Sequence, residues 1–160
     1  MGQAEAGYRI GIHEPAAASI TPFARLQGTT VSQSGFSESG AGALNLNVAP
    51  QTTGSARSVL GAELAGAFGA EGREKLAMQL RLGWAHEYAN TARPVTANFA
   101  GAPGSNFTVF GAAPQTDSAT FSLAANTAVA PGVSFYARYD GEMGAGISSH
   151  ALNGGLRVTW

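Results

Sequence analysis

The chain has 160 residues, of which 44% are hydrophobic and 12% are charged, and its formal net charge is −1. This length is sufficient for one folded core, but the chain is poor in the charge that water-exposed surfaces usually carry. Scattered Lys and Arg exclude an electrostatic case for nucleic-acid binding, and the lack of cysteine excludes disulfides and zinc–thiolate sites.

No stretch approaches the roughly 18 unbroken apolar residues that a transmembrane helix needs, and the first residues lack the basic and apolar regions of a signal peptide. Membrane-spanning β-strands remain compatible with the composition, because they are only about 10 residues long and alternate apolar with polar side chains. Glycine, at 22 of 160 residues, is spread along the chain and favours a β protein with frequent turns.

Alternation of apolar and polar residues predicts about seven strands, each antiparallel to its neighbours. In chain order we expect them near residues 5–13, 18–32, 55–69, 75–91, 117–129, 133–143 and 148–160. The connections at 70–74 and 130–132 are predicted to be tight turns. Those at about 35–55 and 92–116 are long and rich in Gly, Ser, Thr, Asn and Pro, which predicts loops. Short turns at one end and long loops at the other are typical of outer-membrane barrels.

Charged side chains fall on one face of the predicted strands, and we find no Lys, Arg, Asp or Glu on the other. Period two alone does not distinguish a soluble sandwich from a barrel with its polar face inward. The barrel is favoured because Lys or Arg facing mid-bilayer lipid costs about 2–4 kcal/mol, and because Trp84, Tyr88, Tyr139 and Trp160 are expected near strand ends, where aromatic girdles form. The predicted lumen-lining residues are Arg9, Arg25, Glu63, Arg81, Glu87, Arg138, Asp140, Glu142 and Arg157.

Three stretches together resemble the β-barrel translocator domain of autotransporters, the proteins of type V secretion. They are Ile20-Thr21-Pro22-Phe23-Ala24-Arg25-Leu26 with Gly35-Phe36-Ser37-Glu38-Ser39-Gly40; Leu80-Arg81-Leu82-Gly83-Trp84-Ala85-His86-Glu87-Tyr88 with Phe107, Gly111-Ala112-Ala113-Pro114 and Asp117; and Tyr136-Ala137-Arg138-Tyr139-Asp140-Gly141 with the last strand, Ser149 to Trp160. The resemblance covers nearly the whole chain from about Ala6 and implies a single domain over residues 1–160. Barrels of that family have about twelve strands and a helix in the pore, so the chain would supply about the last seven strands.

The resemblance implies an all-β, antiparallel up-and-down transmembrane β-barrel in the bacterial outer membrane, which exports and anchors an N-terminal passenger. The implied partners are outer-membrane lipid, the protein's own passenger segment and the barrel assembly machinery. The last strand resembles the signal that this machinery reads, with Leu152, Leu156, Val158 and Trp160 facing lipid. Two alternatives stay open, a small self-contained eight-stranded outer-membrane barrel and a secreted β-sandwich adhesin.

The chain contains residues of types that take part in catalysis, but they do not occur in any recognised catalytic motif. His13, His86 and His150 could each be combined with a serine and an acid, yet no nucleophile elbow accompanies them. Asp140 and Glu142 would lie about 7 Å apart, a glycosidase-like spacing, but charge pairing with lumen arginines is the stronger interpretation. His86-Glu87 lacks the second histidine of a zinc motif, and Gly40-Ala41-Gly42 lacks the third glycine of a dinucleotide loop. We therefore expect no enzyme activity, metal or cofactor.

Overall fold

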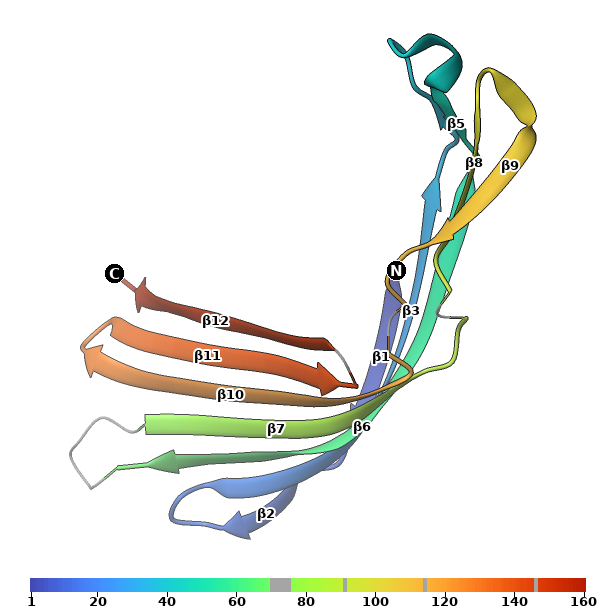
Figure 1. Ribbon diagram of the computed structural model, residues 1–160. Coiled ribbons are helices and arrows are strands. Elements are labelled where there is room, and N and C mark those ends of the chain that lie inside the picture. Colours follow the sequence, from blue (N-terminus) through green and yellow to red (C-terminus); the bar gives the residue numbers. More distant parts are fainter. Residues whose placement is uncertain (70–75, 91, 114, 146) are drawn as a thin grey trace. The chain divides into compact units, whose positions relative to one another are not determined.

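The computed structural model describes residues 1–69, 76–90, 92–113, 115–145 and 147–160, and of Ile147 only the backbone. Its strands form an eight-stranded and a four-stranded sheet (Figure 1). The chain divides into two compact units, which are described separately. The first contains Gln3–Leu26, Ser58–His86 and Asp117–Trp160, and the second contains Met1–Gly2, Gln27–Arg57 and Glu87–Thr116.

Strands of the eight-stranded sheet are ordered β1-β3-β6-β7-β10-β11-β12, and β2 also pairs with β3. Their bounds are β1 (Gly2–Gly7), β2 (Ile10–His13), β3 (Ala18–Gln33), β6 (Gln51–Phe68), β7 (Leu76–Glu87), β10 (Asp117–Ala130), β11 (Val133–Gly144) and β12 (Ile147–Val158). The registers of β2 with β3, β7 with β10, β10 with β11 and β11 with β12 are all antiparallel. This confirms the predicted all-β, antiparallel fold class.

The first predicted strand, residues 5–13, is wrong as a single element, because β1 and β2 are separated at Tyr8 and Arg9. The backbone N–H of Tyr8 donates to the carbonyl of Pro22 in β3 at 3.2 Å. Pro22 has no N–H to donate in return, so the ladder between the strands is interrupted there. The predicted turn at 130–132 is present, with Gly132 at φ +73°. The predicted turn at 70–74 lies outside the described residues.

The prediction of loops at about 35–55 and 92–116 is wrong. These segments form the four-stranded sheet, with strand order β4-β5-β8-β9 and bounds β4 (Phe36–Ser37), β5 (Leu46–Val48), β8 (Pro94–Phe99) and β9 (Ala102–Phe110). One face carries an asparagine ladder in which Asn47 donates to Asn98, and Asn98 to Asn106, each at 3.1 Å. A single 3₁₀ turn, Gly42–Leu44, precedes β5.

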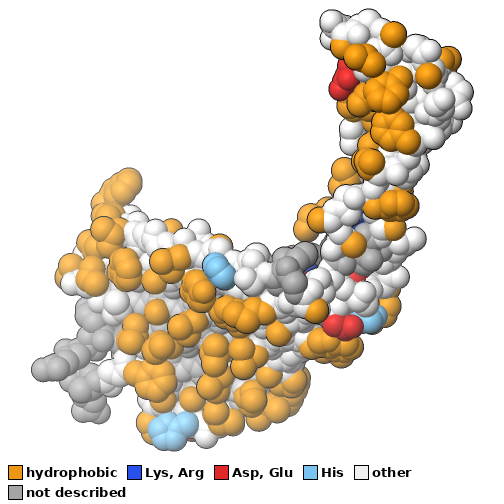
Figure 2. All heavy atoms as spheres, viewed as in Figure 1, with side chains coloured by type: hydrophobic (Ala, Val, Ile, Leu, Met, Phe, Trp, Pro, Cys, Tyr) orange, Lys and Arg blue, Asp and Glu red, His pale blue; other side chains and the backbone are white. Residues whose placement is uncertain are grey.

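The first unit has little apolar core. Phe23, Val59 and Ala85 form its small buried cluster. Many of its large apolar side chains are exposed instead, and Figure 2 shows hydrophobic side chains gathered on one face of the sheet. Among the described residues, no helix is both long enough and apolar enough to cross a membrane. A sheet that displays its apolar side chains and keeps its polar ones partly covered is the reverse of a soluble protein.

Candidate functional site

The strand registers define two faces of the first unit's sheet, because directly paired residues point to the same side. On the polar face, Arg81 lies opposite Ser122, which lies opposite Asp140. On the apolar face, Leu80 lies opposite Leu123, which lies opposite Tyr139. Exposure distinguishes the two faces. The side chain of Arg81, on the polar face, is 23% exposed, whereas its neighbour Leu82, on the apolar face, is 53% exposed. The polar face is therefore the more enclosed one.

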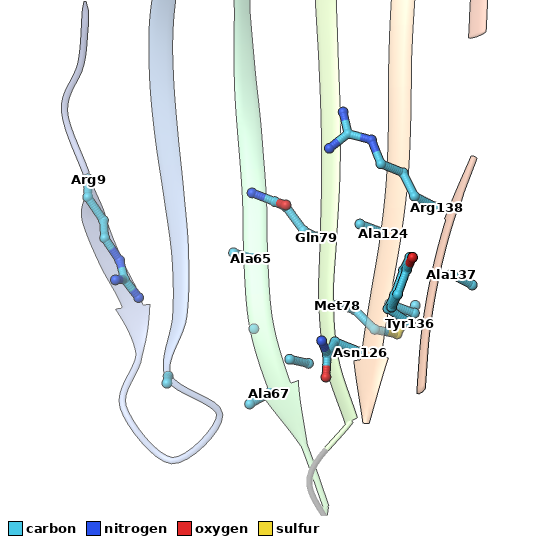
Figure 3. A pocket seen from close by; sticks show the side chains of 14 residues that line it. Arg9, Ala65, Ala67, Met78, Gln79, Ala124, Asn126, Tyr136, Ala137 and Arg138 are labelled. Atoms are coloured by element: carbon cyan, nitrogen blue, oxygen red, sulfur yellow. The ribbon is translucent and has the colours of Figure 1, made fainter. Parts of the chain in front are cut away.

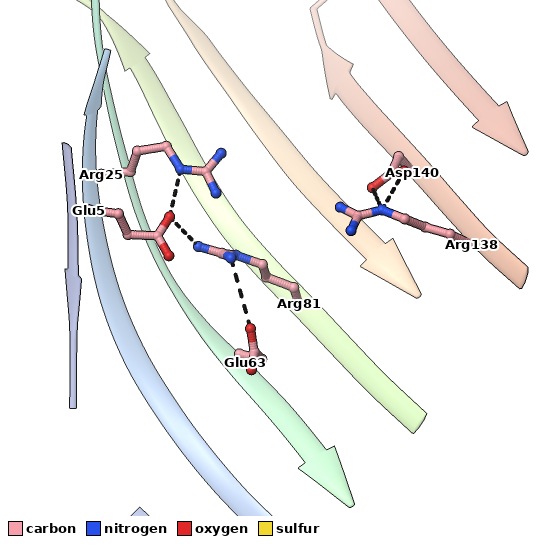
Figure 4. A network of polar contacts seen from close by, with 6 residues as sticks. All are labelled: Glu5, Arg25, Glu63, Arg81, Arg138 and Asp140. Atoms are coloured by element: carbon pink, nitrogen blue, oxygen red, sulfur yellow. Dashed lines mark hydrogen bonds and ion pairs between the residues drawn. The ribbon is translucent and has the colours of Figure 1, made fainter. Parts of the chain in front are cut away.

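An ion-pair network on the polar face joins β1, β3, β6 and β7 (Figure 4). Arg25 Nε and Arg81 Nη2 each donate to Glu5 Oε2 at 2.6 Å, and Arg81 Nη1 lies 3.8 Å from Glu63 Oε2. The Arg81 guanidinium also lies over the ring of Phe23, 3.7 Å from its centroid, a cation–π arrangement. Glu5 was missing from the predicted set, although its alternation with Tyr8, Ile10 and Ile12 already placed it on the polar side.

Three further predicted charges on the polar face, Arg138, Asp140 and Glu142, have partners of their own. Arg138 donates to Asp140 at 2.8 Å within β11, and Ser118 donates to Glu142 at 2.7 Å. Asp140 thus pairs with one of the expected lumen arginines, whereas Arg81 pairs with acids of β1 and β6. Glu87 belongs to the second unit, where it accepts hydrogen bonds from the Ser55 hydroxyl and from the backbone N–H groups of Ala56 and Ala89.

A hollow of about 440 Å³ lies beside these charges (Figure 3). Its polar lining is Arg9, Gln79, Asn126, Tyr136 and Arg138. Most of its other lining residues are alanines, among them Ala65, Ala67, Ala77 and Ala124. Small side chains leave this space unfilled, and two guanidinium groups lie at its border, that of Arg9 and that of Arg138, which is ion-paired with Asp140.

From Leu152 onward, the last strand, β12, has its apolar and polar residues on opposite faces. Leu152, Leu156 and Val158 lie opposite Tyr139, Phe135 and Val133 on the apolar face, and all three are exposed. Asn153 and Arg157 lie opposite Arg138 and Ser134 on the polar face. Trp160 follows the strand and is fully exposed.

Two expectations about the apolar face are wrong. Asp117 at the start of β10 pairs with His86, next to the Trp84–Ala119 pair, so this face does carry a carboxylate. Asp117 lies an even number of residues before Phe121 and Leu123 in β10, so the alternation of this strand already placed it on the apolar face. Tyr139 lies in the middle of β11 and not at its end, whereas Tyr88 and Trp160 do lie just beyond β7 and β12.

The candidate catalytic residues are dispersed or engaged in other contacts. His13 accepts a hydrogen bond from the Ala16 N–H, His150 stacks on Tyr139 with 6.5 Å between centroids, and His86 bonds Asp117. Asp140 and Glu142 share a face, but Arg138 and Ser118 respectively bond them. In the described part of the chain, no group of three or more His, Asp or Glu side chains could hold a metal ion.

An up-and-down antiparallel sheet with an exposed apolar face and an ion-paired polar face defines the class of outer-membrane β-barrel proteins. The family model of the autotransporter beta-domain matches residues 1–140, and the chain belongs to this family. It is therefore part of a translocator of the bacterial outer membrane, from a family that is generally not catalytic. No curated protein matches the chain.

Proposed function

We propose that these strands form the C-terminal part, residues 1–160, of a barrel that exports an N-terminal passenger across the outer membrane and then anchors it. The observation that carries this proposal is the inverted sheet, apolar on its exposed face and ion-paired on its more enclosed face. Lipid would cover the apolar face and the passenger segment would pass along the polar face.

Polar-face residues, some of them in the predicted lumen set, support a path for an extended polar segment. Arg9, Gln79 and Arg138 surround the alanine-lined hollow, where a backbone could approach the sheet closely. The network of Glu5, Arg25, Glu63 and Arg81 would line the same lumen. In this role the charged groups give the lumen a water-compatible surface and take part in no covalent chemistry, so the activity is secretion without turnover.

Filling the hollow tests this function in the full-length parent protein. Ala124 lies opposite Gln79 and Arg138 on the polar face, whereas Ala119, which does not line the hollow, lies opposite Trp84 and Met143 on the apolar face. We expect Ala124→Trp to reduce the amount of passenger that external protease removes from intact cells by about ten-fold, while Ala119→Trp has little effect because indole is compatible with lipid.

The level of assembled barrel serves as the control, measured by heat-modifiable mobility on gels. Equal passenger exposure in the two variants, at equal barrel level, would mean that the polar face is not the export path.

A further inference from the structure

Three side chains meet on the apolar face of the first unit. Trp84 Nε1 donates to Asp117 Oδ1 at 3.0 Å, and His86 Nδ1 lies 2.8 Å from the same oxygen. The rings of Trp84 and His86 are 5.6 Å apart. We propose that Trp84, His86 and Asp117 form a lipid-headgroup site that binds a primary ammonium group. The inference rests on the proposed function in one respect, that the apolar face contacts lipid.

The location of the site indicates headgroup depth. A carboxylate facing the hydrocarbon would be strongly unfavourable, whereas the cost falls toward the membrane boundary, where Trp is also favoured. His86 is the next-to-last residue of β7 and Asp117 is the first residue of β10, so both strands end beside the site. The segment between them is the long connection that, in outer-membrane barrels, lies on the outer side of the membrane.

The contacts select a cation. Both the indole and the imidazole approach Oδ1 of Asp117, so Oδ2 is engaged by neither of them. The Asp117 side chain is 55% exposed and Trp84 is 49% exposed, which leaves a carboxylate beside an accessible aromatic ring. An ammonium group can donate hydrogen bonds to that carboxylate and lie against the ring face. A phosphate would be repelled by Asp117, and one carboxylate with one imidazole is too small a ligand set for Mg²⁺ or Ca²⁺.

Competition between two zwitterionic lipids tests the site. Trp160→Phe keeps an aromatic residue at the end of the last strand, and with any tryptophan outside this chain also replaced by Phe, Trp84 is the only tryptophan of the full-length parent. This protein is reconstituted in mixtures of phosphatidylethanolamine and phosphatidylcholine, one of them carrying brominated acyl chains that quench fluorescence. Phosphatidylcholine has the same charge but no N–H donor. At equal bulk amounts of the two lipids, we expect phosphatidylethanolamine to be about two to five times more abundant than phosphatidylcholine next to Trp84. This is the ratio that one partly exposed ion pair would produce.

Asp117→Asn should bring this preference to about one, and Asp140→Asn, the same chemical change on the polar face, should preserve it. Heat-modifiable mobility identifies any variant that fails to fold, and Asp117→Glu, which keeps the charge, should then retain a preference.

Equal quenching by both lipids in the protein that retains Asp117 would overturn the headgroup site while leaving lipid contact established. Two further measurements use brominated phosphatidylglycerol as a third lipid and a metal chelator. A preference for phosphatidylglycerol, or a preference that the chelator abolishes, would also overturn the headgroup site, because the ligand would then be an anion or a bridging metal. If neither brominated lipid quenched Trp84, lipid contact by the apolar face would itself be wrong.

Discussion

At the residue scale, Gly61 shows how closely β6 approaches its neighbours on the polar face. A Cβ atom there would overlap the carbonyl oxygen of Leu82 and lie 2.7 Å from Phe23 Cζ and 2.8 Å from Gly83 Cα. Two of these neighbours are backbone, which cannot rotate away. We expect Gly61→Ala to lower the free energy of unfolding by about 1–3 kcal/mol through overpacking.

Gly11 in β2 is the matched control, because a Cβ there meets nothing within 4 Å. Gly11→Ala should leave stability unchanged or raise it by about 0.4–1 kcal/mol. Urea unfolding of the barrel in detergent, followed by tryptophan fluorescence, measures both. Similar values for the two variants would contradict the close approach at Gly61.

Arg81 and Arg138 provide a second comparison, between a shared and an isolated ion pair. Arg81 pairs with Glu5 and Glu63 and its side chain is 23% exposed, whereas Arg138 pairs with Asp140 and is 52% exposed. We expect Arg81→Gln to destabilise the barrel by about 1.5–3 kcal/mol, since partly covered acids lose a charged donor, and Arg138→Gln by less than about 1 kcal/mol. The same urea experiment applies, and an equal loss would mean that the network adds nothing beyond its separate pairs.

Alternation placed most residues on the correct face, including Arg25, Glu63 and Arg81, because a side-chain period of two is a local property of the sequence. It did not identify which charges meet. The pairing of Glu5 with Arg81 joins strands far apart in the chain, and a one-dimensional pattern contains no register between them. Asp117 is a different case, because its even separation from Phe121 and Leu123 already indicated the apolar face, and its pairing with His86 confirms that placement.

At the scale of elements, the long strands could be predicted and the short ones could not. β10 and β11 contain 14 and 12 residues, enough for a repeated alternation. β4 and β5 contain 2 and 3 residues, and β5 pairs with β8 about fifty positions away. Neither local composition nor period could reveal such a sheet, and Gly-, Asn- and Thr-rich segments resemble loops.

The last strand carries the prediction that belongs to this scale. If its apolar stripe, ending at Trp160, is the signal for the assembly machinery, deleting Trp160 from the full-length parent should lower the amount of inserted barrel several-fold. Loss of one interfacial ring would cost only about 1–3 kcal/mol of stability and would leave the insertion rate nearly unchanged. Pulse-labelling followed by heat-modifiable mobility measures that rate. Normal amount and rate of insertion would leave Trp160 as an ordinary interfacial ring.

At the scale of the whole molecule, the sheet order leaves β1 and β12 as its end strands. Exposed edges and an exposed apolar face both favour association. We therefore expect the isolated chain to require detergent for solubility, as measured by size-exclusion chromatography with light scattering. A monodisperse monomer in detergent-free buffer would contradict this expectation.

The central claim, that lipid covers the apolar face and water the polar face, can be tested with two neighbouring residues. The chain contains no cysteine, so Ser122→Cys and Leu123→Cys each introduce one at adjacent positions of β10 that point to opposite faces. In outer membranes containing the full-length parent without other cysteines, a small water-soluble maleimide should label Cys at 122 at least ten-fold faster than at 123, because thiolate formation and the reagent both need water. A lipid-soluble maleimide should reverse the order. Faster labelling of position 123 by the water-soluble reagent would contradict the account, because the apolar face would then be in contact with water.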